Sequence, residues 1–122
     1  MTSSKRWAYA LLGFVAAALA IGFAIARHAG WLPLAVFAIG PDIALVVGSG
    51  PGLEQGRLHP RAVPLYNAVH RFWAPVVLTV AALLLQADAW VGAGLAWCAH
   101  IAIDRSLGFG LRNAQGFQRD AG

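Results

Sequence analysis

Four side chains that can bind a metal ion or move a proton lie within the apolar segments of this sequence. Asp42 follows a proline, His70 lies further along, and His100 and Asp104 are four residues apart. Imidazole nitrogens and carboxylate oxygens are ligands for zinc, manganese and iron, and the same groups serve as general acids and bases. Because no HExxH or comparable signature is present, the spacing leaves both metal binding and acid–base catalysis open.

Three further polar residues are expected to support this set. Tyr66 and Asn67 precede His70 by four and three residues, so on a helix they share its face. Arg105 follows Asp104 and is expected either to pair with a carboxylate or to extend towards lipid headgroups. The alternative is that all these groups only hydrogen-bond neighbouring helices and fix their packing.

The composition predicts that lipid surrounds the elements that carry these residues. The chain has 122 residues, of which 59% are hydrophobic and 11% charged, whereas a soluble domain carries about 25% charged residues. The expected fold is all-α, a single domain (1–122) built as a four-helix transmembrane bundle with antiparallel up-down topology. The expected helices and tail are 6–27, 31–48, 63–85, 89–108 and the polar tail 109–122.

Local signals set the details of these helices. The first apolar stretch is about 20 residues long, longer than the 7–15 of a signal peptide, so we expect it to be retained. Pro41 is expected to open the second helix near Phe37, and Pro75 to kink the third. Asp88 is expected to cap the fourth helix, which Gly108 should end.

The basic residues predict which end of the bundle faces the cytoplasm. With four crossings and a cytoplasmic N-terminus, both termini lie in the cytoplasm and only Arg27 falls on the far side. The other basic residues then share the cytoplasmic side: Lys5, Arg6, Arg57, Arg61, Arg71, Arg105, Arg112 and Arg119. The net charge of +4 is therefore interpreted as membrane orientation, with the lipid bilayer as partner and no nucleic acid. A homo-oligomer or an accessory partner stays open.

This topology brings the polar residues to one depth. Asp42 ends the second crossing, Asn67 and His70 begin the third, and His100 and Asp104 end the fourth. At about 1.5 Å of rise per residue, all five fall within about two helical turns of each other. Because ionisable groups rarely face lipid, they should turn inwards. The sequence thus predicts a polar site in the cytoplasmic half of the bundle.

Three motifs resemble a known family. They are 40–42 (GPD), 66–70 (YNAVH) with Pro75 behind it, and 97–111 (WCAHIAIDRSLGFGL). Together they are similar to domain of unknown function 4260, whose members carry PD, YNxxH and AHIxxDRxLG[YF]GL. The resemblance covers about 32–117 and implies a small multi-pass protein of the bacterial inner membrane. It implies no activity.

The chain departs from that family in two places. The loop 49–61 is longer and more polar than the family's usual loop. The tail 116–120 reads GFQRD and lacks the histidine that the family tends to carry there. A role for the tail in any site is therefore not implied.

Three functions remain open on the sequence. The first is a cytoplasm-facing site of Asp42, His70, His100 and Asp104 that binds a divalent metal (zinc, manganese or iron) or performs acid–base chemistry on a lipid-like substrate. The second is a non-enzymatic structural or accessory subunit. The third is a proton or ion pathway, which would need a polar route past the apolar stretch 76–85.

Overall fold

The computed structural model describes residues 1–119, so Asp120 and the last two residues of the predicted tail lie outside the described residues. Two short 3-10 turns cover Gly40–Asp42 and Pro60–Ala62. Residues 1–119 contain no β-strand, which confirms the all-helical fold class. The helices are α1 (Ser3–Ala26), α2 (Trp31–Ile39), α3 (Ile43–Val47), α4 (Val63–Val69), α5 (Trp73–Leu84) and α6 (Asp88–Ser106).

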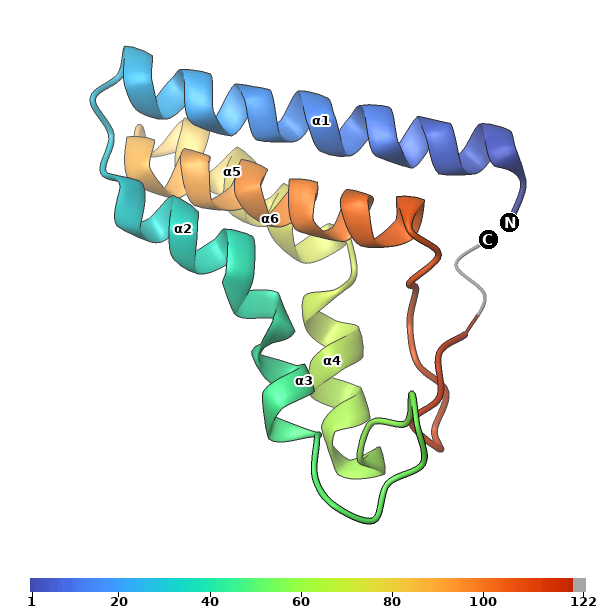
Figure 1. The fold of residues 1–122 in the computed structure, drawn as a ribbon. Coiled ribbons are helices and arrows are strands. Elements are labelled where there is room, and N and C mark those ends of the chain that lie inside the picture. The colour runs from blue at the N-terminus through green and yellow to red at the C-terminus, as the bar shows by residue number, and fades with distance from the viewer. Residues whose placement is uncertain (120–122) are drawn as a thin grey trace.

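Helix α6 is the centre of the fold, and α1, α2 and α5 all pack against it (Figure 1). Small residues make this packing close, because they let helix backbones approach each other. On α1 the buried residues are Gly13, Ala16, Ala20 and Ala24. They face an equally small surface of α6, whose buried residues include Ala96, Ala99 and Ala102.

The second and third predicted helices are each broken, which corrects the expectation of continuous helices over 31–48 and 63–85. Pro41 cannot donate to the carbonyl of Phe37, and a 3-10 turn separates α2 from α3 there. The other break covers 70–72 and precedes Pro75. Pro75 therefore lies in the first turn of α5, where a proline is tolerated, and the expected kink is instead a break ahead of it.

Beyond the two breaks, α3 and α4 turn away from α1 and α6 and form a separate lobe with the loop and tail (Figure 1). Ala44, Leu58, Ala62 and Tyr66 form its buried core. The tail closes over this core, because the amide of Leu58 donates to the carbonyl of Gly116 at 2.9 Å. The break at 40–42 and the break at 70–72 lie side by side where the lobe meets α6, because Asp42 and His70 are 3.4 Å apart.

The ends of the helices follow an up-down order. The two tight turns lie together at the left of Figure 1, whereas the N-terminus lies at the right end of α1 and the 49–59 loop lies at the lower end of the lobe. Arg27 and Asp88 join these turns by an ion pair of 3.7 Å. Asp88 is the first residue of α6 and Ala87 is the N-cap, so the expected capping role of Asp88 is wrong.

The C-terminus of α6 is closed by a Schellman motif. Gly108 has φ +96°, and the amide of Phe109 donates to the carbonyl of Asp104 at 2.8 Å. The amide of Gly108 donates to the carbonyl of Arg105 at 3.1 Å. This pattern confirms that Gly108 ends the helix and fixes the backbone that carries Asp104.

Two helical stretches of the described chain, Ser3–Ala26 and Pro60–Leu84, are long and apolar enough to cross a membrane. The apolar stretch Trp31–Val47 is shorter. Both longer stretches expose most of their apolar surface, whereas the core helix of a soluble protein buries its apolar face. The helical bundle therefore fits a membrane protein, and length and composition are the basis for that statement.

Candidate metal-binding site

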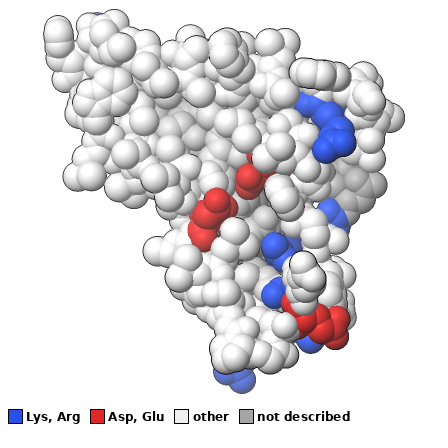
Figure 2. Space-filling model, viewed as in Figure 1, with Lys and Arg blue, Asp and Glu red and all other residues white. Residues whose placement is uncertain are grey.

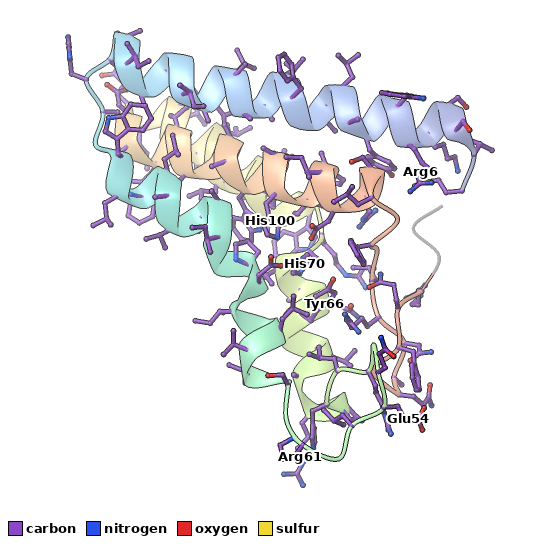
Figure 3. The ribbon with its side chains drawn as sticks, in the orientation of Figure 1. Arg6, Glu54, Arg61, Tyr66, His70 and His100 are labelled. Carbon is purple, nitrogen blue, oxygen red and sulfur yellow. The ribbon has the colours of Figure 1, made fainter. Side chains whose placement is uncertain are left out.

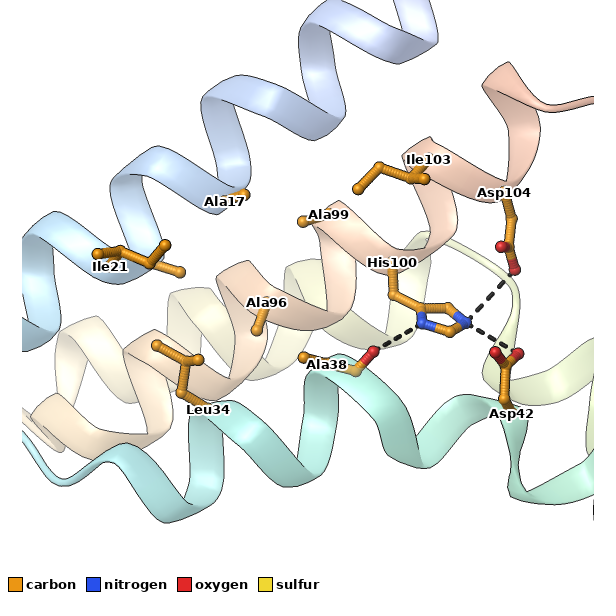
Figure 4. Close-up of a pocket in the computed structure, with 11 residues that line it drawn as sticks. Ala17, Ile21, Leu34, Ala38, Asp42, Ala96, Ala99, His100, Ile103 and Asp104 are labelled. Carbon is orange, nitrogen blue, oxygen red and sulfur yellow. Dashed lines mark hydrogen bonds and ion pairs between the residues drawn. The ribbon is translucent and has the colours of Figure 1, made fainter.

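The two helix breaks bring Asp42 and His70 beside α6, where they meet His100 and Asp104 (Figures 3 and 4). Asp42 ends the 3-10 turn after α2, and His70 is the C-cap of α4. One nitrogen or oxygen atom from each of the four residues lies within 4.8 Å of the other three. All four predicted ligands therefore converge.

Each histidine Nε2 atom of the cluster lies close to one oxygen of both carboxylates. His70 Nε2 lies 3.4 Å from both Asp42 Oδ1 and Asp104 Oδ2. His100 Nε2 lies 3.1 Å from Asp42 Oδ1 and 3.3 Å from Asp104 Oδ2. A tetrahedral zinc ion with ligands at about 2.0–2.1 Å would hold neighbouring ligand atoms about 3.3 Å apart. The four nitrogen–oxygen distances lie near that spacing, whereas the set as a whole extends to 4.8 Å, so the ligand atoms are more spread out than those of a regular tetrahedral site.

Backbone carbonyls fix the orientation of both imidazole rings. His70 Nδ1 donates to the carbonyl of Tyr66 at 2.8 Å, and His100 Nδ1 donates to the carbonyl of Ala38 at 2.7 Å. Because a carbonyl only accepts, both Nδ1 atoms carry a proton. In the neutral form of this tautomer, each ring turns the lone pair of Nε2 towards the cluster, as metal-binding histidines do.

The histidine side of the cluster is buried, whereas its carboxylate side is partly exposed to solvent. His70 is only 2% exposed, and its Nε2 is a buried atom without a hydrogen-bond partner among the described residues. The side chains of Asp42 and Asp104 are 44% and 22% exposed. Figure 2 shows acidic side chains in the hollow between the upper helices and the lobe. The carboxylates are therefore the side from which solvent or another ligand approaches.

Ionised carboxylates in this cluster favour positive charge among the ligand atoms, either as protons on the imidazoles or as a bound cation. Two ionised carboxylates and two neutral imidazoles direct only lone pairs at one another. Such a set is repulsive unless protons or a cation lie between the ligand atoms. A divalent cation would neutralise both carboxylates and give Nε2 of His70 a partner.

Tyr66 and Arg105 position the His70 end of the cluster. The Tyr66 ring stacks on the His70 ring with centroids 4.0 Å apart. Arg105 donates to the carbonyl of His70 at 3.2 Å and lies over the Phe72 ring. Its guanidinium thus binds the backbone at the helix break, which differs from the carboxylate pair and the headgroup contact expected for it.

Asn67 belongs to the tail rather than to the cluster. Its Nδ2 donates to the carbonyl of Arg112 at 3.0 Å, and its Oδ1 accepts from the amide of Arg112 at 2.8 Å. The Arg112 guanidinium covers the Tyr66 ring at 4.9 Å from its centroid. Asn67 supports the site indirectly, by holding the tail against Tyr66.

Three supporting groups were missed by the sequence reasoning. Two are the backbone carbonyls of Ala38 and Tyr66. The third is the indole of Trp97, which donates to the carbonyl of Val69 at 2.7 Å and ties the end of α4 to α6. Pro41 signalled only that the helix would break near Ala38, whereas the carbonyl of Tyr66 also accepts from the amide of His70 at 3.1 Å and had no signal in the sequence.

Comparison with known proteins gives one match. The model of a family described as Domain of unknown function (DUF4260) matches residues 8–121, which is nearly the whole chain and includes most of α1. No curated protein matches significantly, and neither does any solved structure. The function must therefore be argued from the geometry of the site.

Proposed function

The chain belongs to the family Domain of unknown function (DUF4260), and we propose that Asp42, His70, His100 and Asp104 together bind one divalent metal ion. The observation that carries the proposal is the Nε2 atom of His70. It is buried and has no hydrogen-bond partner in the described part of the chain, Nδ1 of the same ring donates to a carbonyl, and two carboxylate oxygens lie 3.4 Å away. A metal ion at the centre of the cluster would satisfy all of these groups at once.

The donor set favours zinc, manganese or iron. Mixed imidazole and carboxylate ligands suit all three ions. Four protein ligands complete a tetrahedral zinc site, whereas a six-coordinate manganese or iron ion keeps two positions for water or substrate. The exposed carboxylate side is where such positions would lie.

The chemistry we propose is hydrolysis or group transfer at an oxygen ester of a lipid-like substrate. A bound divalent ion would supply Lewis-acid activation of the substrate oxygen. Asp42 is the most exposed member of the cluster, so its carboxylate is the best placed to accept a proton from solvent or substrate. His70 and His100 are held in one orientation by backbone carbonyls and serve as fixed ligands.

We place this site in the cytoplasmic half of a multi-pass protein of the bacterial inner membrane, with both termini in the cytoplasm. The two tight turns, which lie together at the end of α1 opposite the N-terminus, support this placement (Figure 1). The exposed apolar surface of α1 and α5 fits contact with lipid. The bias of basic residues towards one side gives the orientation.

The metal proposal is tested by purifying the protein in detergent and measuring its metal content by mass spectrometry, before and after incubation with zinc, manganese or iron. We expect one ion per chain. Asp104→Asn and His70→Ala should lose it, whereas His28→Ala, which changes an exposed turn residue, should keep it. A wild-type protein that binds none of the three ions would disprove the metal centre.

The competing function is a structural one, in which the cluster joins α2, α4 and α6. Its contacts do link three helical segments, so loss of His100 would then lower thermal stability to the same extent with and without added metal. A metal centre predicts instead that added metal raises the unfolding temperature of the wild type and leaves that of His100→Ala unchanged. The proton or ion pathway stays a third prediction.

A further inference from the structure

A cavity of about 390 Å³ lies beside the cluster, between α1, α2 and α6 (Figure 4). Its walls are apolar and come from Ala17 and Ile21 of α1, Leu34 of α2, and Ala96 and Ile103 of α6. Its polar groups are Asp42, His100 and Asp104. Pockets that bind small molecules usually measure about 300–1,000 Å³ and combine apolar walls with a few polar groups.

Small residues make this cavity. The three facing helices contribute Ala17, Ala20, Ala38, Ala96 and Ala99 to its lining, so no large side chain fills the space between them. The cavity is also open at its edge, because the lining residues Ile21 and Ile103 are 48% and 43% exposed. A hydrocarbon chain can therefore enter sideways between α1 and α2, which make few contacts with each other (Figure 4).

The polar groups lie together on one side of this apolar space. Figure 4 shows the His100 ring between the carboxylates of Asp42 and Asp104, with Ala17 and Ile21 on the facing helix. A ligand that fits must present a hydrocarbon part to the alanine walls and an oxygen headgroup to the cluster. Two carboxylates alone repel an anionic headgroup, whereas a bound divalent ion offsets their charge and attracts it.

We propose that this cavity binds the single hydrocarbon chain of an amphiphile whose anionic oxygen headgroup, a carboxylate or a phosphate, coordinates the metal at Asp42, His100 and Asp104. The inference rests on the proposed metal centre and names the class of amphiphile, substrate or product, that binds beside it. The chain lies along Ala17, Ile21 and Leu34, and the headgroup approaches from the exposed side of the carboxylates. The volume suits one chain rather than a two-chain phospholipid.

The test uses palmitic acid that carries a photoreactive diazirine, together with the matching monoalkyl phosphate, and the full-length protein in a neutral detergent. After illumination, labelled peptides are located by mass spectrometry. We expect the label on the α1 and α6 segments that line the cavity. Ala17→Phe places a ring in the cavity and should lower that labelling by about tenfold, the equivalent of about 1.4 kcal/mol.

The matched control is Ala18→Phe, which adds the same ring to the neighbouring residue on the exposed face of α1. The Ala18→Phe variant should be labelled to the same extent as the wild type. Equal labelling in the two variants would overturn the inference, because the probe would then mark the outer surface. If Ala17→Phe does not fold, Ile21→Trp fills the cavity from an exposed lining position and should give the same loss.

Metal content measured on the same samples separates the two proposals. Cavity-specific labelling that a chelator abolishes supports both of them. Cavity-specific labelling in a protein that binds no metal refutes the metal centre and with it the headgroup coordination. If the protein binds metal but Ala17→Phe does not lower the labelling, the cavity inference alone is refuted. If only one of the two probes labels the cavity, the headgroup of that probe, carboxylate or phosphate, is the one that the site binds.

Discussion

The Nε2 atom of His100 lies 3.1 Å from Oδ1 of Asp42, and Nδ1 of the same ring donates to the carbonyl of Ala38. One imidazole of α6 therefore contacts both the last turn of α2 and the 3-10 turn that follows it. The break at Pro41 is what allows this contact, because it frees the backbone and turns the Asp42 carboxylate towards α6. The helix break is thus part of the site.

The charge of Asp42 should matter more than its shape. Asp42→Asn keeps the size of the side chain but removes one negative charge that lies 3.1 Å and 3.4 Å from the two Nε2 atoms. We expect metal affinity measured by calorimetry to fall by at least about 10–100-fold, the loss typical of even an outer-shell change. Asp88→Asn, which changes an acidic residue paired with Arg27, is the control, and equal affinity in both variants would contradict the prediction.

Metal binding should weaken as the pH falls. The ligands bind metal as neutral imidazoles and ionised carboxylates, so protons compete with the ion for the same lone pairs and binding releases protons. The sign is therefore fixed: the dissociation constant should rise between about pH 8 and about pH 5. Calorimetry in buffers of different ionisation enthalpy measures the released protons directly, and an affinity that is independent of pH would argue against histidine ligation.

The four ligands could be predicted from the sequence because helical spacing and the expected up-down order of the helices already place them together. His100 and Asp104 share a face of one helix, and topology brings Asp42 and His70 to the same level. The direction of α3 and α4 could not be predicted, because a single proline does not tell whether a helix bends or breaks. The role of Asn67 could not be predicted either, because its partner Arg112 is 45 residues away in the sequence. The helical pattern does not tell where the tail that carries Arg112 packs.

The tail should be held in place by Gly116. This residue has φ +97°, a conformation that only glycine adopts without strain, and a Cβ atom there would overlap the carbonyl of Leu58. We expect Gly116→Ala to cost about 1–3 kcal/mol of stability and to make the tail more sensitive to limited proteolysis. Gly50→Ala is the control, because that loop position has open space around it; the same protease sensitivity in both variants would refute the assignment.

Gly94 should be the position where α5 and α6 tolerate no added atom. A Cβ atom at Gly94 would overlap the hydroxyl of Thr79 and approach its backbone nitrogen to 3.0 Å. Because both helices are fixed at this crossing, we expect Gly94→Ala to lower the free energy of unfolding by about 1–3 kcal/mol. Gly22→Ala makes the same change on α1, where nothing lies within 4 Å, and there alanine should stabilise the helix by about 0.5–1 kcal/mol. Thermal unfolding in detergent measures both variants, and shifts of the same sign would show that the crossing of α5 and α6 is looser than this contact implies.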